Sequence, residues 1–457
     1  MASVSRTLTR IKQDLQPFLP EDSILAACRE VGHKWRNRKF GSLRTLHLFI
    51  LQVLCFNTAM THLRHLAKDA INAPAYCKAR MRLPLAVLQM LLRRSSQAMR
   101  DATGGRGLWC GLRAHLVDGS STIAPDTPSS QKAFGQPKGC KKGCGFPVPK
   151  VLGLFDAYTG MVVEALSFPL YTHEQSQVWR LHPLLGPGDL LVGDRGFCSF
   201  AHLAMLSLRG VMGLFRMHQK QIVGFRPHRR HLRKNQRYGR RSGMSRRQRQ
   251  DIPTSRFIRR LGKHDQVVAW QPSRRPKWMK DRQWKMLPRE LLVRELRYQI
   301  PRNGQRTFCI TIATTLRDPE RYPKEKIAEL YGVRWTVETH FAELKTTLKM
   351  RKVKSKTAMG VQKELAIYCL VYNLVHLVML EASRRKKVTP DRISFIDTVR
   401  WLLSAEPGEA PPDLVVNPRR PGRHEPRVVK DREDTYTKMT RPRAVLRKAL
   451  INQANGA

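Results

Sequence analysis

The chain has 457 residues, of which 84 are lysine or arginine and 35 are aspartate or glutamate, giving a formal net charge of +49. This excess predicts a polyanionic partner, with DNA or RNA as the leading candidate. An anionic membrane would attract the same charge, but the longest apolar run, residues 365–380, is shorter than the roughly 20 residues that a span needs. The N-terminus has dispersed charges and no apolar secretion signal, so we expect a cytoplasmic protein with no membrane partner.

Residues 1–105 are predicted to be helical, because apolar residues recur there at spacings of three and four. Such a basic helical domain could bind DNA or could pack as a plain bundle on the next domain.

Residues 106–215 change to a strand pattern, with short β-rich runs separated by Gly, Pro and Thr. The predicted order is three strands, a helix, a strand, a helix and a strand, at residues 112–122, 149–160, 161–171, 173–185, 189–197, 201–210 and 211–217. Three strands followed by a helix, a strand and a helix is the order of an RNase H-like α/β sheet.

The remaining chain divides into three predicted parts. Residues 216–305 form a basic, mainly β insertion, and residues 306–405 return to the core with a strand, a polar-faced helix and a buried apolar helix. Residues 406–457 are a basic tail rich in Pro and Arg. Residues 226–260 of the insertion contain fourteen Lys or Arg and one acid. This segment is either a DNA-binding segment or a solvated loop, and it could be a loop that orders on binding.

The nine cysteines are scattered and odd in number, which indicates reduced thiols. Cys140 and Cys144 form a lone C-x3-C without a second pair or a suitably spaced His, so the signal for zinc is weak. The glycine-rich basic loop of residues 138–145 could approach target DNA or be an ordinary surface loop.

The most informative stretch is LYGVRWTVETHFAELKTTLKM, which holds Tyr331, Arg334, Glu338 and Lys345. Steps of seven residues return a helical side chain to nearly the same angle, so these four residues are predicted to share one face. A carboxylate among two cations and a phenol suits phosphodiester chemistry, with the carboxylate on a metal ion and the cations on phosphates. An exposed helix with ordinary i,i+4 charge pairs is the alternative.

Two aspartates are candidate partners of that helix. Asp118 and Asp194 are each predicted to end a buried strand, so a crossing helix would bring Glu338 near both. Three such anions would repel unless divalent metal bound them, and two Mg²⁺ about 4 Å apart would serve an in-line displacement at phosphorus. Each aspartate alone is equally typical of a turn.

Together these motifs resemble the DDE transposases of bacterial insertion sequences, in the YREK or insertion-sequence-four family. The resemblance rests on DGS at Asp118, GDRGF at Asp194 and the spacing Y-(2)-R-(3)-E-(6)-K. It implies an RNase H-like core interrupted by a mainly β insertion, with a helical N-terminal domain and a helical C-terminal region. Asp118, Asp194 and Glu338 would hold two Mg²⁺, with Mn²⁺ as substitute, and Tyr331, Arg334 and Lys345 would contact DNA.

The resemblance further implies a homodimer that bridges two transposon ends and moves the element by cut and paste, through a hairpin intermediate and strand transfer into target DNA. Members that use the hairpin step are expected to stack a flipped base on an aromatic side chain. The strand before the helix offers Phe308 and Ile310 rather than Trp, and Trp270, Trp278 and Trp284 lie upstream. The hairpin step is therefore a weaker expectation than the metal triad.

Two other functions stay open at this point, an RNase H-like nuclease that cannot join DNA and a catalytically inert DNA-binding protein. Three further acids lie near these motifs in the sequence. Glu174 is open for a supporting role, Asp156 reads as a turn residue, and Glu343 should face elsewhere, about 140° around the helix from Glu338. No histidine has a metal-ligand spacing that identifies a site.

The basic segment gives a first prediction. Replacing several arginines between Arg226 and Arg260 by glutamine should weaken DNA binding and flatten its dependence on salt. Each lost phosphate contact should change the slope of log K against log [salt] by about 0.9 on duplex DNA, measured by fluorescence anisotropy. An unchanged slope would mean that the segment does not contact phosphates.

Overall fold

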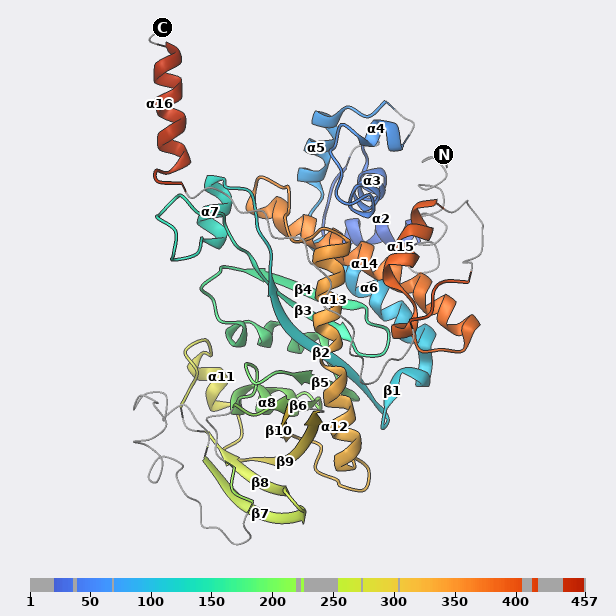
Figure 1. Ribbon diagram of the computed structural model, residues 1–457, viewed down its shortest axis with the longest axis vertical. Helices are drawn as coiled ribbons and strands as arrows, with labels where there is room; N and C mark the ends of the chain where they lie inside the picture. The colour runs from blue at the N-terminus through green and yellow to red at the C-terminus, as the bar shows by residue number, and fades with distance from the viewer. Residues whose placement is uncertain are drawn as a thin grey trace.

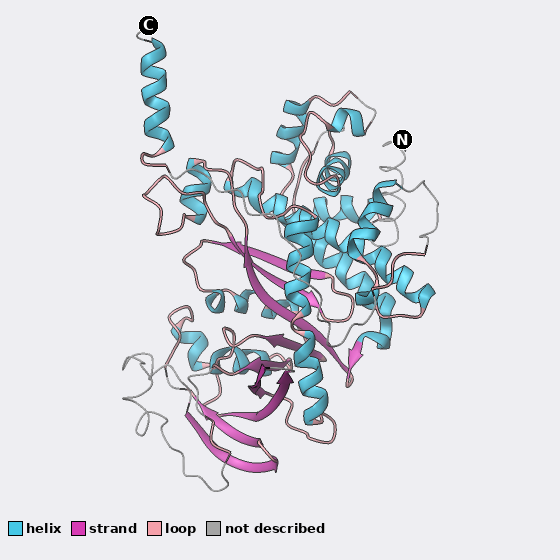
Figure 2. Ribbon diagram, viewed as in Figure 1, coloured by secondary structure: helices cyan, strands magenta, loops and turns pink. Residues whose placement is uncertain are grey.

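The computed structural model describes residues 20–35, 39–67, 70–218, 223–225, 254–272, 274–302, 305–404, 413–417 and 439–455. The arginine-rich residues 226–253 lie outside this set, so the prediction for most of that segment stays a prediction. The described part of the chain forms a single mixed sheet with helices packed around it (Figures 1 and 2).

The sheet has ten strands in the order β4-β3-β2-β5-β6-β10-β9-β8-β7, with the short β1 beside β2. Strands β2, β3 and β4 are antiparallel, whereas β5 and β6 run parallel to β2. The bounds are β1 Leu108–Trp109, β2 Leu112–Ser121, β3 Lys150–Asp156, β4 Val162–Phe168, β5 Asp189–Gly193, β6 Met212–Arg216, β7 Thr254–Gly262, β8 Asp265–Gln271, β9 Leu291–Arg302 and β10 Gln305–Thr314. The predicted RNase H-like α/β core with a β insertion is confirmed.

The insertion adds to the core sheet instead of forming a sheet of its own. Strand β10 pairs antiparallel with β6 and β9, and β9 pairs in turn with β8. Hydrogen bonding therefore runs without a break from the RNase H-like strands to β7 (Figure 1).

Helices occupy most of the N-terminal and C-terminal parts, as the apolar spacing predicted. Their bounds are α2 Glu21–Glu30, α3 Ser42–Leu54, α4 Leu63–Leu66, α5 Ala73–Arg82, α6 Leu85–Thr103, α7 Pro128–Phe134, α8 Phe200–Ser207, α11 Asp281–Lys285, α12 Lys324–Val333, α13 Thr336–Ala342, α14 Ala358–Lys386, α15 Phe395–Ser404 and α16 Arg443–Asn455. The domain boundaries drawn from the sequence stay predictions.

Helix α14 is the central core helix. Within the described residues it is the helix long and apolar enough to cross a membrane, but 94% of its apolar window is buried inside the protein. It packs against α3, α6, α15 and strand β4. Burial against protein on nearly every side explains why this helix is apolar around its whole circumference.

Both faces of the central strands are buried, which explains their apolar sequences. In β2, Leu116 belongs to the core cluster that includes α14, whereas the next residue, Val117, belongs to a second cluster that includes α8. Successive side chains of a strand point to opposite faces. The central strands therefore bind two apolar layers together.

Residues 173–185, predicted as a helix, form three short 3₁₀ turns at Glu174–Ser176, Val178–Arg180 and His182–Leu184. Backbone bonds there join residues three apart, as from the Gln177 N–H to the Glu174 carbonyl. Pro183 has no N–H, and its ring would clash with the carbonyl four residues earlier in an α-helix. The α-helical prediction was wrong for this segment.

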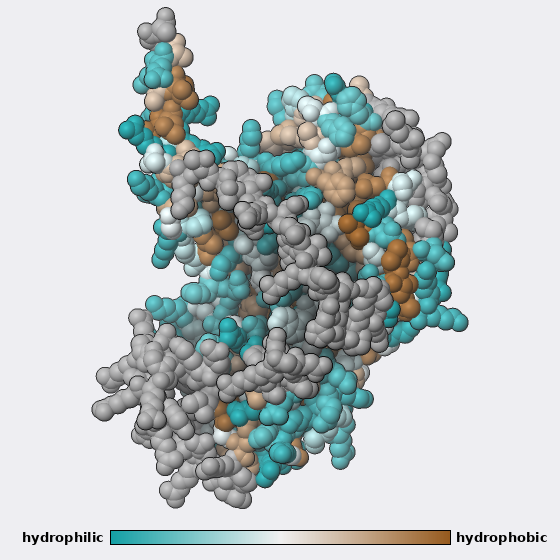
Figure 3. Space-filling view, viewed as in Figure 1, coloured by the Kyte–Doolittle hydropathy of each residue, from teal (hydrophilic) through white to brown (hydrophobic). Residues whose placement is uncertain are grey.

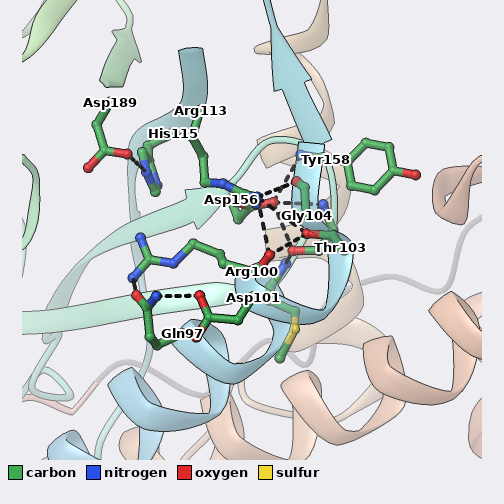
Figure 4. Close-up of polar contacts among 12 residues, drawn as sticks. Gln97, Arg100, Asp101, Thr103, Gly104, Arg113, His115, Asp156, Tyr158 and Asp189 are labelled. Atoms are coloured by element: carbon green, nitrogen blue, oxygen red, sulfur yellow. Dashed lines mark hydrogen bonds and ion pairs between the residues drawn. The ribbon is translucent and has the colours of Figure 1, made fainter. Parts of the chain in front are cut away.

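Arg113 pairs with the buried Asp156 of β3 and also links the start of β2 to the end of α6 (Figure 4). Arg113 of β2 lies 3.0 Å from the Asp156 carboxylate and donates further bonds to carbonyl oxygens at the end of α6. Asp156 also accepts hydrogen bonds from the backbone of Tyr158 and from both donors of Thr159, as expected of a turn residue.

Strand β4 is held to α14 by one side-chain amide. Asn373 accepts a hydrogen bond from the Val162 N–H and donates one to the Val162 carbonyl, each 2.8 Å long and buried. Asn373→Ala should leave both backbone groups unpaired, at a cost of about 1–3 kcal/mol each in the free energy of unfolding. Urea denaturation measures this, with the exposed Asn452→Ala as control; equal stabilities of the two variants would contradict the prediction.

Candidate active site

The two aspartates lie side by side where two parallel strands part. Val117 of β2 is in register with Gly193, the last residue of β5, so Asp118 and Asp194 follow directly on neighbouring strands. The sequence predicted that Asp118 ends its strand. That prediction was wrong, because β2 continues to Ser121 through its pairing with β3. The end of β5 is what frees the space beside Asp118.

The helix that faces these aspartates is not a regular α-helix throughout. After α12, the N–H groups of Arg334 and Trp335 bond to carbonyls three residues earlier, and after α13 a π-helical turn runs from Glu343 to Thr347. The first irregularity winds the chain more tightly and the second more loosely. The two deviations act in opposite directions, so they offset each other along the predicted stripe.

Three side chains of the stripe reach the strands that carry the aspartates. The Tyr331 hydroxyl lies 3.5 Å from an Asp194 oxygen, and the Arg334 guanidinium lies 3.2 Å from Asp118. Lys345 donates to the hydroxyl of Ser120, at 3.4 Å. Glu338 lies 3.9 Å from the Arg334 guanidinium, and its side chain is 56% exposed. The stripe therefore faces the aspartates, with Arg334 between Asp118 and Glu338.

The site concentrates negative charge in a half-buried position. Burial raises the pKa of Asp118, and the charges of Asp194 and Glu174 raise it further. The Gly119 N–H, which donates to Asp118 at 2.8 Å, and the Arg334 guanidinium oppose that rise in pKa. Burial also lowers the pKa of Lys345 and raises that of Tyr331.

Glu174, left open by the sequence, lies directly against the Asp-Gly pair. A Cβ at Gly119 would stand 2.4 Å from its carboxyl carbon, and Lys150 of β3 lies 3.7 Å from one of its oxygens. Glycine after Asp118 is therefore what allows a further carboxylate to approach. The sequence signal for Glu174 was only its acidity.

The three predicted carboxylates are linked through Arg334 and Tyr331 and do not converge on one point. Within the described residues, the trio of potential ligand atoms that lie within 4.8 Å of one another is His340, Glu343 and His376. Carboxylate oxygens are nevertheless the donors that Mg²⁺ prefers. Burial is the main cause of the raised pKa of Asp118, and the charges of Asp194 and Glu174 add to it. The donor chemistry of the site fits a hard divalent cation.

The tryptophans considered for base stacking all have contacts within the protein. Trp270 is buried and donates to Glu295, Trp278 stacks on His202 with centroids 4.8 Å apart, and Trp284 meets the edge of Phe200. Ile310 is buried in β10. The side chain of Phe308 lies outside the described part. Trp335, not considered from the sequence, is 48% exposed with the Arg334 guanidinium 5.1 Å from its ring.

A family model described as the transposase DDE domain matches residues 109–374, which is more than half of the chain. The chain belongs to the transposase DDE domain family. The matched residues include β2, β5 and the whole stripe from Tyr331 to Lys345. Membership makes this protein a DNA transposase, an enzyme that uses a divalent metal and acts on DNA.

A curated relative supports a narrower assignment. The transposase InsG of insertion sequence element IS4 from Escherichia coli (strain K12) is 26% identical over 381 residues, covering 79% of this chain and 77% of that protein. The resemblance to insertion-sequence-four transposases is confirmed. A solved structure, the piggyBac transposase synaptic complex with hairpin DNA, has a TM-score of 0.39 and 11% identity, covering 88% of this chain and 80% of that one. That likeness is too low to bear on the hairpin step.

Arg334 should stabilise the folded transposase more at high pH than at low pH. Without this guanidinium the folded-state pKa of Asp118 should rise further above its ordinary value of 3.8. A carboxyl whose pKa is higher in the folded than in the unfolded state stabilises the folded state only while it is protonated. The free energy of unfolding of the variant should therefore fall as pH rises from about 4 through the raised pKa of Asp118. Arg334→Gln should therefore cost little near pH 4 and about 1.5–3 kcal/mol near pH 8.

Urea denaturation in EDTA at both pH values measures that difference. Lys285→Gln, which removes a cation whose side chain is 77% exposed, is the control and should cost little at either pH. An equal loss of stability for Arg334→Gln at the two pH values would show that Asp118 is not the group it neutralises.

Proposed function

We propose that this transposase cleaves DNA at the ends of its element and joins those ends to target DNA in a Mg²⁺-dependent reaction at Asp118, Asp194 and Glu338. The observation that supports this most directly is the side-by-side position of the two aspartates at the end of the β2–β5 pairing, opposite the helix that carries Glu338. Binding alone would give no reason to gather acids in a protein of such high positive charge.

We assign the metal-ligand role to the three carboxylates because they offer oxygen donors, which favour Mg²⁺ and accept Mn²⁺. Two ions held there about 4 Å apart would activate the attacking hydroxyl and stabilise the leaving oxygen at phosphorus. The protein's own contribution is to hold the acids together at the cost of mutual repulsion, which Arg334 offsets in the metal-free form.

The remaining residues of the stripe would position DNA. Arg334 contacts Asp118, and Lys345 contacts Ser120, two residues further along β2. From there both cations would bind phosphate oxygens near the cleaved bond. Tyr331 is buried, and its hydroxyl donates toward Asp194, so in the free protein it would orient that carboxylate. On bound DNA its single O–H would turn to a phosphate oxygen instead. Glu174 would add to the negative potential that attracts the metal.

We propose that two copies of the chain act together, one on each end of the element. Helix α16 extends away from the rest of the molecule, and apolar side chains are visible along it (Figures 1 and 3). Val445, Leu446, Leu450 and Ile451 on this helix are between 40% and 66% exposed. An unpaired apolar face of this kind supports pairing with a second copy in the complex with DNA.

Glu338→Gln should abolish cleavage and joining while DNA binding stays nearly intact or improves. The change removes a metal ligand but no cation. Loss of the charge stabilisation that metal provides costs several kcal/mol, which corresponds to about 10³-fold or more in rate. The assay uses labelled DNA with the ends that flank the gene, a supercoiled target plasmid, and Mg²⁺ or EDTA.

The matched control is Glu329→Gln, an exposed glutamate on α12, which should behave as the wild type. Metal-dependent end cleavage with joined product, absent in Glu338→Gln alone, is the expected result. Cleavage without joining would indicate a nuclease. Simultaneous loss of binding and chemistry in Glu338→Gln would contradict the role assigned to Glu338.

A further inference from the structure

A second group of potential metal ligands lies behind the catalytic stripe. His340 of α13, Glu343 at the start of the π-helical turn and His376 of α14 each direct one donor atom into a region within which these atoms are at most 4.8 Å apart. Both histidines are buried, and the Glu343 side chain is 19% exposed. Glu343 thus faces α14, away from the aspartates, as the helical geometry predicted.

His376 is held in the form that binds a metal. Its Nδ1 lies 2.8 Å from the Thr159 carbonyl, which only accepts hydrogen bonds, so Nδ1 carries the proton. In neutral His376 the Nε2 lone pair then points toward the Glu343 carboxylate, and Nε2 is buried without a hydrogen-bond partner. A histidine that donates its other N–H to a backbone carbonyl is the usual arrangement at metal centres.

The Glu343 carboxylate lies beyond hydrogen-bond distance of both imidazoles, and the Tyr372 hydroxyl bridges it to His340. The Glu343 carboxylate oxygen lies 3.7 Å from His340 Nδ1 and 3.9 Å from His376 Nε2. Hydrogen bonds between such atoms would be roughly 2.7–3.2 Å long. Ligands about 2.0–2.1 Å from a tetrahedral zinc ion stand roughly 3.4 Å apart. That is slightly less than these two separations and less than the 4.8 Å within which all three donor atoms lie.

The surrounding residues fix the two imidazoles. Gly160 has φ of +72°, and a Cβ there would lie 2.6 Å from Cε1 of His376 and 3.0 Å from Cε1 of His340. Phe155 stacks on His340, with ring centroids 5.4 Å apart. The Tyr372 hydroxyl lies 2.8 Å from His340 Nδ1 and 2.9 Å from a Glu343 oxygen, so it is the fourth polar group at the cluster.

We propose that His340, Glu343 and His376 bind one Zn²⁺ as a structural ion, distinct from the Mg²⁺ proposed at the catalytic carboxylates. Two imidazole nitrogens and one carboxylate select zinc over magnesium, which prefers oxygen ligands alone. The ion ties the π-helical turn to α14 and to the β3–β4 turn, and so fixes the orientation of the helix that presents Glu338, five residues before Glu343.

The test is the zinc content of the full-length protein, purified without a histidine tag and dialysed into Mg²⁺ buffer without zinc. Mass spectrometry of the metals should find about one zinc ion per chain. A chelator selective for zinc should remove it and lower Tm, and added ZnSO₄ should restore both. Tyr372→Phe, which removes only a hydroxyl, should weaken zinc binding by about 10–100-fold.

Four variants locate the ion. His376→Gln and Glu343→Gln should lose zinc, whereas Glu338→Gln should keep it, which separates this site from catalysis. A double variant, Cys140→Ser with Cys144→Ser, should also keep zinc, and Co²⁺ in the wild type should show no thiolate charge-transfer band. Wild-type protein without zinc, and with a Tm that ZnSO₄ does not change, would overturn the proposal even if the histidine variants failed to fold.

Discussion

The gathering of acids in a half-buried position is the constraint on which this protein's candidate active site depends. The register between β2 and β5 brings Asp118 beside Asp194, and Gly119 admits Glu174 to the same place. Burial and like charge then raise the pKa of Asp118. Arg334, whose own side chain is only 5% exposed, is the described cation in direct contact with that carboxylate. The same group of acids thus lowers the stability of the metal-free protein and would raise its affinity for a metal ion.

The helix that supplies Arg334 and Glu338 takes its position from α14. Tyr372 and His376 meet the π-helical turn, Asn373 holds strand β4, and Glu364 accepts a hydrogen bond from Asn57 of the N-terminal part. Helix α14 therefore connects the N-terminal helices, the sheet edge and the stripe from Tyr331 to Lys345. Its nearly complete burial reflects this role, and a zinc ion at its contact with the π-helical turn would stiffen the joint nearest to Glu338.

The β insertion contacts the chain just before α12, ahead of the segment that supplies Arg334 and Glu338. Arg294 of β9 forms a buried ion pair with Asp265 of β8, with contacts of 2.8 and 2.5 Å, and also donates to the Tyr322 carbonyl just before α12. Removing one partner of a buried pair is far more costly than losing an exposed one. Arg294 therefore links the insertion to the segment that leads into Tyr331.

Local patterns in the sequence determined much of this protein. Alternation and apolar spacing predicted the strands and most helices, because each depends on which side chains face the core. The spacing of Tyr331, Arg334, Glu338 and Lys345 predicted one functional face, because a helical period is a local property. The charge of +49 predicted a polyanionic partner, and family membership makes that partner DNA. The roles of Asp118, Asp194 and Glu338 as metal ligands remain predictions for the Glu338→Gln experiment.

Only the tertiary structure decided the features that depend on contacts between distant residues. Strand pairing, not the Asp118 sequence, determined where β2 ends, and the insertion strands joined the core sheet because β10 pairs with β6. The 3₁₀ turns beside Glu174 and the π-helical turn at Glu343 were not visible in an apolar pattern. His340 and His376 are 36 positions apart on two different helices, so no spacing rule could have paired them. Their proximity arises from packing, which a linear pattern does not encode.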